Sequence, residues 1–129
     1  MGRARGERRV ALPADRLTLN QWTLEGQWEV GEESAVLEVA GGSIAYRFEG
    51  RDLNLVLVPP SAGAASFAVR VDGSPPGEDR GLDVDAAGEG VVDRPRMYQL
   101  VRLRGPTRQR TAEITFRDAG VAAYVFTFG

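Results

Sequence analysis

Cysteine and histidine are both absent from this sequence of 129 residues. Without cysteine the chain can form no disulfide, no thiolate metal site and no thiol nucleophile. Without histidine it lacks the commonest general base and the commonest ligand of transition metals. Only carboxylates, hydroxyl groups and arginine remain for catalysis. We therefore expect a protein that is not an enzyme and that binds no cofactor and no metal.

Lysine is absent too, and all 16 basic residues are arginine. We attribute this to the base composition of the genome rather than to phosphate recognition. The net charge is −2, whereas a nucleic-acid-binding surface is net basic and often carries aromatic platforms. The sequence therefore predicts no nucleic-acid partner.

Long apolar runs are missing as well. No stretch approaches the roughly 18 consecutive apolar residues of a membrane-spanning helix. The start, MGRARGERRV, has no apolar segment of the kind found in secretory signals. Hydrophobic residues make up 43% of the chain and charged residues 26%, which is typical of a soluble globular domain. We expect no direct insertion into a membrane.

Short strand patterns fill most of the sequence. Large apolar residues alternate with small or polar ones at residues 44–48 and 67–71, as in half-buried strands. Residues 53–58 are apolar on both sides except at Asn54, which suits an interior strand that ends at a pair of prolines. The pair Asp72-Gly73 is a hairpin turn signal.

Turn residues recur about every 8–12 residues, and no helical periodicity is present. The pattern predicts an all-β, antiparallel sandwich of roughly eight to ten strands, one of them at residues 82–85. Residues 1–16 mix arginine with glycine and lack apolar periodicity. We therefore predict a flexible arginine-rich arm at residues 1–16 and a single β-sandwich domain over residues 17–129.

A candidate sugar site lies around Tyr98, which follows a loop that contains proline and has polar neighbours in Arg96 and Gln99. A sugar ring needs an apolar platform for its C–H face and polar side chains for its hydroxyl groups. Trp22 is a second aromatic that such a site would use, whereas Trp28, Tyr46 and Tyr124 are assigned to the core. The alternative is that Tyr98 is itself part of the core and that Arg96 pairs with a nearby carboxylate.

The acidic residues Asp83 and Asp85 would provide acceptors beside this site. Together with Glu89 they also suggest a calcium loop, since calcium prefers several oxygen ligands. Their spacing does not match the helix–loop–helix calcium pattern, so a solvated acidic turn is the favoured interpretation. Asp72 with Asp83 and Asp85 could form a pair of glycosidase carboxylates, but a turn accounts for Asp72 by itself.

Four motifs together resemble a known family. They are N-x-W-x-L-x-G-x-W at residues 20–28, V-D-G-x-P-P-G at 71–77, Y-Q-L-V at 98–101 and the closing F-T-F-G. From about Leu17 to Gly129 the chain resembles the thioredoxin-like C-terminal domain. This β-rich module follows the thioredoxin-fold domain in DipZ-type cytochrome c biogenesis proteins and in related bacterial redoxins.

The resemblance implies a jelly-roll sandwich similar to carbohydrate-binding modules, with no catalytic residues, because the redox cysteines of the family belong to the preceding domain. Only about sixteen residues precede Leu17 here and no C-x-x-C occurs, so the chain is expected to be either an excised domain or a free-standing module. Its compartment would be extracytoplasmic if it follows the DipZ-type relatives, and otherwise cytoplasmic.

Two functions follow from the resemblance. The first is a non-catalytic module that binds carbohydrate or cell-envelope glycan and is accessory to a thioredoxin-like domain. The alternative is a structural or protein-interaction domain that packs on a thioredoxin-fold partner and its substrates. Exposed aromatics beside arginine, aspartate or glutamine would favour sugar. A contiguous apolar patch would favour a protein interface.

Overall fold

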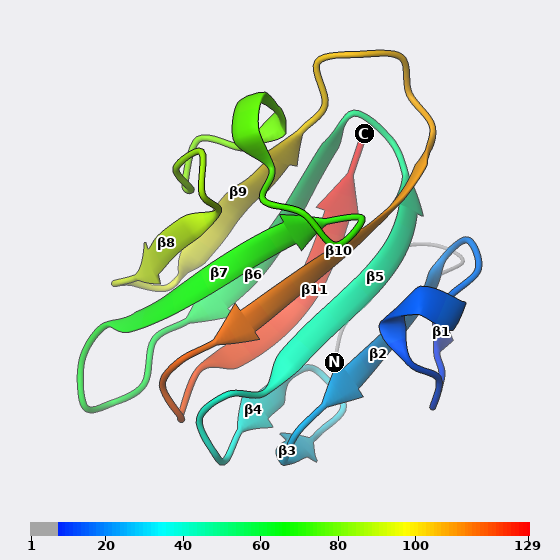
Figure 1. Ribbon diagram of the computed structural model, residues 1–129. Coiled ribbons are helices and arrows are strands. Elements are labelled where there is room, and N and C mark those ends of the chain that lie inside the picture. The colour runs from blue at the N-terminus through cyan, green and yellow to red at the C-terminus, as the bar shows by residue number, and fades with distance from the viewer. Residues whose placement is uncertain (1–7) are drawn as a thin grey trace.

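The computed structural model describes residues 8–129, which form two β-sheets packed face to face (Figure 1). Sheet A contains β1 (Arg8–Arg9), β2 (Gln21–Glu25), β5 (Ser43–Glu49), β10 (Gln109–Phe116), β7 (Ala65–Val71) and β8 (Glu89–Val92), in that spatial order. Sheet B contains β3 (Trp28–Val30), β4 (Ala35–Leu37), β11 (Ala122–Phe128), β6 (Asp52–Val58) and β9 (Arg96–Arg102), again in spatial order. Two short 3₁₀ helices, η1 (Ala14–Arg16) and η2 (Gly77–Asp79), lie in the connections.

Neighbouring strands are antiparallel except for the short parallel pair of β1 and β2. The predicted all-β, jelly-roll-type antiparallel sandwich is therefore confirmed. The described residues contain eleven strands, slightly more than predicted, because several of them are only two to four residues long. Between residues 8 and 129, no helix has the length and apolar composition needed to cross a membrane.

The core lies between the two sheets. It consists mainly of the large apolar residues that occupy every second position of the strands and point inward. The large apolar side chains of β5 and β7 are buried, and so are the three leucines of β6, which lies between β11 and β9. Ring contacts join the sheets, since Tyr46 of β5 stacks on Phe126 of β11 at a centroid distance of 4.8 Å. Burial of each such side chain stabilises the fold by about 1.5–3 kcal/mol.

The outer face of sheet A carries short side chains. Thr23, Ser43 and Ala45 alternate with inward-facing residues of β2 and β5, yet all three are buried. Short residues at these positions let other parts of the chain lie close to the sheet, and η1 contacts β10 on this side. In this part of the face, backbone and short side chains form the surface, and longer polar side chains surround it.

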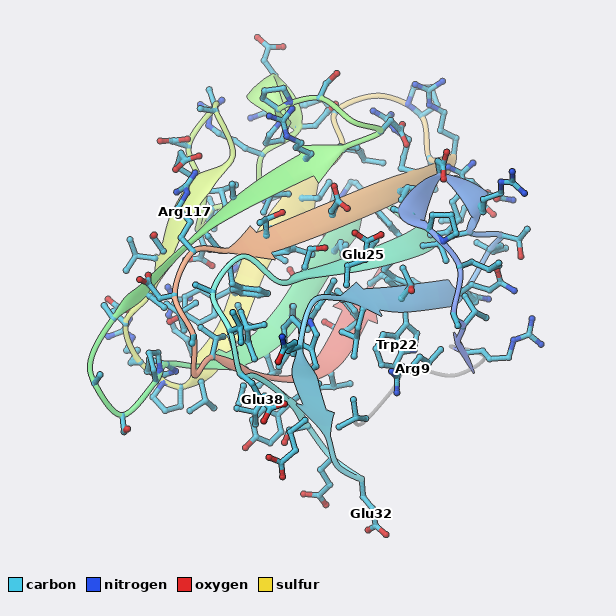
Figure 2. All side chains as sticks on the ribbon, turned by 60° about the horizontal axis from the view of Figure 1, so that its bottom comes forward. Arg9, Trp22, Glu25, Glu32, Glu38 and Arg117 are labelled. Carbon is cyan, nitrogen blue, oxygen red and sulfur yellow. The ribbon has the colours of Figure 1, made fainter. Side chains whose placement is uncertain are left out.

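The N-terminal segment forms contacts with the sandwich ahead of Leu17. Arg8 and Arg9 pair with Gln21 and Trp22 of β2, and Figure 2 shows Arg9 and Trp22 at the same edge. Residues 1–7 of the predicted arm lie outside the described residues. The division between an arm at residues 1–16 and a domain at residues 17–129 stays a prediction, for which a deletion test is given below.

Residues 82–85 form a turn, so the strand predicted there is wrong. The physical reason is the side chain of Asp83, whose Oδ2 accepts the backbone N–H of Gln99 in β9 at 2.6 Å. In a regular strand pair, a backbone carbonyl oxygen would accept this N–H of Gln99 instead of the carboxylate of Asp83. Val84 is buried, whereas Leu82 is 74% exposed.

Candidate functional site

Tyr98, the centre of the predicted sugar site, lies in the core. Its side chain is fully buried on β9, and its ring meets Phe67 edge to face at a centroid distance of 6.3 Å. Its hydroxyl group accepts the backbone N–H of Asp93 at 3.1 Å and can donate to the backbone oxygen of Arg94 at 2.7 Å. The ring therefore presents no face to a ligand.

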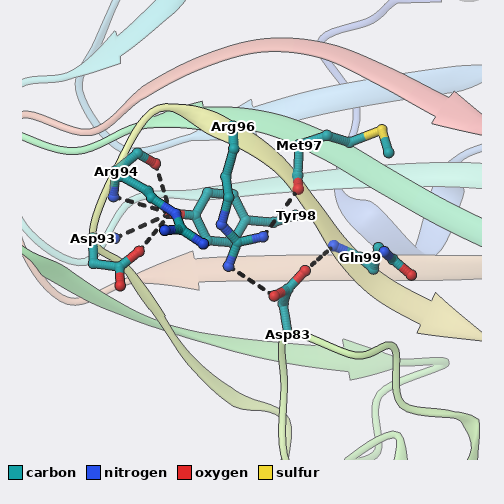
Figure 3. A network of polar contacts seen from close by, with 7 residues as sticks. All are labelled: Asp83, Asp93, Arg94, Arg96, Met97, Tyr98 and Gln99. Atoms are coloured by element: carbon teal, nitrogen blue, oxygen red, sulfur yellow. Dashed lines mark hydrogen bonds and ion pairs between the residues drawn. The ribbon is translucent and has the colours of Figure 1, made fainter.

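Arg96 lies over the ring of Tyr98 and closes that side of the sandwich (Figure 3). The guanidinium carbon is 3.9 Å from the ring centroid, within the range of a cation–π interaction. One guanidinium nitrogen donates to Oδ1 of Asp83 at 2.8 Å, and another donates to the backbone oxygen of Met97 at 3.1 Å. Asp83 thus bridges Arg96 and Gln99, and it fixes the loop before β8 against β9.

The charges of this pair are stabilised by their contacts. Burial by itself would raise the pKa of Asp83, but hydrogen bonds from Arg96 and from the backbone N–H of Gln99 outweigh it, so the pKa lies below its ordinary value. The same hydrogen bond raises the pKa of Arg96. Asp83 therefore remains ionised at neutral pH and acts as an anchor for the loop.

The structure brings together four of the predicted site residues, namely Asp83, Arg96, Tyr98 and Gln99. The side chains of Asp83, Arg96 and Tyr98 contact one another, and Gln99 joins them through its backbone N–H. The expectation that Tyr98 stacks on a sugar is wrong because its ring is inside the core. The alternative interpretation, a buried tyrosine with Arg96 paired to a carboxylate, describes what is seen.

The other two predicted residues lie elsewhere. Trp22 is 4% exposed and belongs to the core between the sheets, so it offers no platform either. Asp85 is exposed, and its Oδ1 accepts the backbone N–H groups of Ala87 and Glu89 within its own turn. Across residues 8–129, no group of three acidic side chains is placed to hold a metal ion. The turn accounts for Asp85 without calcium.

No aromatic ring among the described residues is in the exposed class. Seven large apolar side chains are exposed, and none of them is aromatic: Leu12, Leu19, Val30, Val39, Leu82, Val91 and Met97. Trp28 and Tyr124, both assigned to the core from sequence, are half-buried instead. The Nε1 of Trp28 donates to the backbone oxygen of Glu25 at 2.8 Å, and its ring meets Phe116 edge to face.

A cleft with a volume of about 410 Å³ lies on the outer face of sheet A. We call it the sheet-A cleft. Its lining comprises Ala14 and Asp15 of η1, Arg47 of β5, the turn residues Asp72 and Gly73, and Thr111 and Glu113 of β10. The sequence predicts a turn at Asp72, but it contains no signal that Asp72 and Arg47 face the same hollow.

Arg47 is held in place within the sheet-A cleft. It donates to Oγ1 of Thr111 at 3.1 Å, and it lies 3.8 Å from Oδ1 of Asp72. Asp72 accepts the Nε–H of Arg110 at 2.6 Å and the backbone N–H of Thr111 at 2.9 Å. The guanidinium group of Arg47 and the carboxylate group of Asp72 are thus oriented before any ligand binds. The two side chains remain 29% and 42% exposed.

An apolar stripe lies on the outer face of sheet B. Val36 of β4 pairs with Ala122 of β11, which pairs with Val58 of β6, and Val56 of β6 pairs with Met97 of β9. The three valines are partly exposed and Met97 is 44% exposed. Glu29 of β3, which pairs with Val36, lies beside this stripe on the same face.

Comparison with solved structures identifies the same fold in carbohydrate esterases. A family two carbohydrate esterase from Clostridium thermocellum, in complex with cellohexaose, matches with a TM-score of 0.65 and 17% identity over 84% of this chain and 31% of that one. The family two carbohydrate esterase from Cellvibrio japonicus matches with a TM-score of 0.60 and 14% identity, over 81% of this chain and 29% of that one.

A carbohydrate-binding module, CsCBM6-3 from Clostridium stercorarium in complex with cellobiose, matches with a TM-score of 0.48 and 18% identity over 98% of this chain and 100% of that one. The chain spans less than a third of each esterase, so these likenesses bear on the fold alone. No curated protein matches the sequence. The family model described as "Thioredoxin like C-terminal domain" matches residues 4–129. The chain therefore belongs to the thioredoxin-like C-terminal domain family.

Proposed function

We propose that the chain is a non-catalytic module that binds carbohydrate and serves as an accessory to a thioredoxin-like domain. The observation that carries this proposal is the sheet-A cleft, which combines the short residues Ala14, Gly73 and Thr111 with a fixed set of polar groups. The fold supports it, since one esterase that shares the fold is in complex with cellohexaose. Family membership supports the association with a thioredoxin-like domain.

The chemistry of the sheet-A cleft suits the hydroxyl groups of a sugar. Arg47 offers N–H donors, Asp72 and Glu113 offer carboxylate acceptors, and Thr111 offers a hydroxyl group. Because Arg47 and Asp72 are already oriented by their neighbours, little side-chain entropy is lost when a ligand binds. Among the described residues no aromatic ring lines the cleft, so recognition would depend on hydrogen bonds, and we expect weak binding.

The test is isothermal titration with cellohexaose and a screen of neutral glycans, on the wild-type chain and on Arg47→Gln. We expect wild-type binding, and a loss of about tenfold in Arg47→Gln, because a charge-assisted hydrogen bond is removed. The matched control is Arg94→Gln, which removes one exposed arginine from the loop before β9. Equal affinity of Arg47→Gln and wild type would contradict the proposal, as would the absence of binding to every glycan.

The apolar stripe on sheet B favours a second function, contact with a thioredoxin-like domain. Covering a partly exposed apolar surface of this kind with a partner removes it from water, which lowers the free energy of the complex. We expect a thioredoxin-fold domain from the same genome to bind the wild-type chain, and Val58→Arg to abolish the complex in sedimentation velocity. Glu29→Gln, also on the outer face of sheet B, serves as the control. A complex that withstands Val58→Arg would rule out this surface.

A further inference from the structure

Four arginines gather at the end of the sandwich where β9 ends. Arg51 lies in the turn between β5 and β6, Arg80 follows η2, Arg102 ends β9 and Arg104 comes two residues later. Figure 1 shows η2, the end of β9 and the turn between β5 and β6 at one end of the molecule. None of these four arginines lines the sheet-A cleft, and none belongs to the group formed by Asp83, Arg96, Tyr98 and Gln99.

Backbone contacts hold the three segments side by side. The backbone N–H of Leu103 donates to the backbone oxygen of Arg51 at 2.7 Å, and that of Gly81 donates to the backbone oxygen of Leu100 at 3.0 Å. Arg80 also forms a β-bridge with Val101. The cluster is therefore a fixed feature of the fold, although its members are up to 53 positions apart in sequence (Arg51 to Arg104).

The four arginines line a cleft of about 340 Å³ together with Leu82 and Leu103. We call it the arginine cleft. Within the described part of the chain no carboxylate lines it. Asp52 beside it lies 3.3 Å from Arg51 and 3.8 Å from Arg102, as single contacts rather than forked pairs.

The remaining two arginines are held by backbone oxygens. Arg80 donates to Gly77 at 2.9 Å, and the Nε of Arg104 donates to Glu78 at 3.0 Å. A guanidinium group has five N–H donors, so these contacts orient the side chains and leave donors for a ligand. The net charge of the chain is −2, so the positive charge of this cleft is a local feature. A cleft lined by positive charge attracts an anionic ligand.

We infer that the arginine cleft binds the carboxylate groups of an acidic glycan, that is, a chain that carries uronic acid residues. Guanidinium groups recognise planar carboxylates through paired hydrogen bonds. Leu82, which is 74% exposed, adds apolar surface for the C–H face of a sugar ring. Single-stranded nucleic acid fits less well, because none of the described residues that line the cleft has an aromatic ring on which bases could stack. This inference rests on the proposed glycan-binding function and names a ligand class for it at a second site.

The test compares polygalacturonate with its fully methyl-esterified form in affinity gel electrophoresis. The two polymers share a backbone and differ in charge. We expect the wild-type chain to be retarded by polygalacturonate but not by the ester, and the effect to weaken with added salt. The double variant Arg102→Gln/Arg104→Gln should bind polygalacturonate at least about tenfold more weakly.

A charge-matched control separates this site from net charge. The double variant Arg16→Gln/Arg94→Gln removes two exposed arginines outside the cleft and should bind like the wild type. Equal loss in both double variants, or no loss in Arg102→Gln/Arg104→Gln, would overturn the inference. So would polyglutamate or single-stranded DNA binding as tightly as polygalacturonate. Thermal unfolding of each variant confirms that it is folded.

The two glycan proposals fail in different ways. Binding of neutral glycans that depends on Arg47, without binding of polygalacturonate, would overturn the arginine cleft and leave the sheet-A cleft standing. Binding of polygalacturonate that depends on Arg102 and Arg104, without binding of neutral glycans, would do the reverse. Binding of neither class would end both proposals.

Discussion

Replacing Tyr98 separates its core role from a ligand role more sharply than any other change. The side chain is fully buried, its ring packs on Phe67, and Arg96 covers it. Truncation of a buried aromatic to alanine costs about 3–5 kcal/mol. Tyr98→Phe keeps the ring and loses only the hydroxyl group. Its backbone partners, at Asp93 and Arg94, belong to exposed residues that water can reach, so we expect a cost of about 1 kcal/mol.

These costs translate into unfolding temperatures. For a domain of this size, 1 kcal/mol corresponds to roughly 3–5 °C, so Tyr98→Ala should lower the midpoint by about 10–20 °C and Tyr98→Phe by about 3–5 °C. Thermal unfolding followed by circular dichroism, with urea titration as a check, measures both. Glycan affinity measured below the midpoint should be unchanged in Tyr98→Phe. A loss of less than about 1 kcal/mol in Tyr98→Ala would refute the assignment of this ring to the core.

Two further predictions concern the loop before β8 and the N-terminal segment. Because the pKa of Asp83 is lowered in the folded state, its contribution to stability is fully present above its ordinary value near pH 3.8 and is lost as the pH falls through the lowered value. Asp83→Asn should therefore cost about 1–2 kcal/mol at pH 7, with a difference from wild type that shrinks below about pH 4 in urea titrations. Deletion of residues 1–14 removes the backbone hydrogen bonds from Arg8 to Asn20 and from Val10 to Trp22, and the two that Pro13 and Ala14 accept from Arg16 and Leu17. We expect a midpoint drop of no more than about 5 °C, and a larger drop would place this segment within the domain.

The fold was predictable from sequence because the strands alternate so regularly. Residues 44–48 and 67–71 put their large side chains into the core, and residues 53–58 form an interior strand. Asp72 and Gly73 both have positive φ, at 51° and 82°, in the expected turn. These signals are local: each depends on residues within one strand or one turn.

The candidate site was less predictable because its geometry depends on contacts between distant segments. The alternation of residues around Tyr98 is the same whether its ring is buried or exposed. The ring is buried because Phe67 of β7 and Arg96 pack against it. Residues 82–85 alternate like a strand, but the hydrogen bond from Gln99 to Asp83 gives this segment another conformation. The register shift in the pairing of β6 with β9 lies between Leu53 and Asn54 and lets adjacent residues of β9, Leu100 and Val101, both be buried. Periodicity of two cannot show such a bulge.

The distribution of aromatics constrains how this domain can bind anything. The chain has two tryptophans, three tyrosines and five phenylalanines, and no described one is exposed as a flat surface. Seven of the ten rings lie in the core and Trp28, Tyr124 and Phe128 are half-buried, so most of them stabilise contacts between strands that are far apart in sequence. At the two proposed glycan sites, the sheet-A cleft and the arginine cleft, recognition would depend on arginine and carboxylate groups. Such contacts are directional and screened by salt. A glycan at either cleft should thus be released by salt more readily than one held by stacked rings.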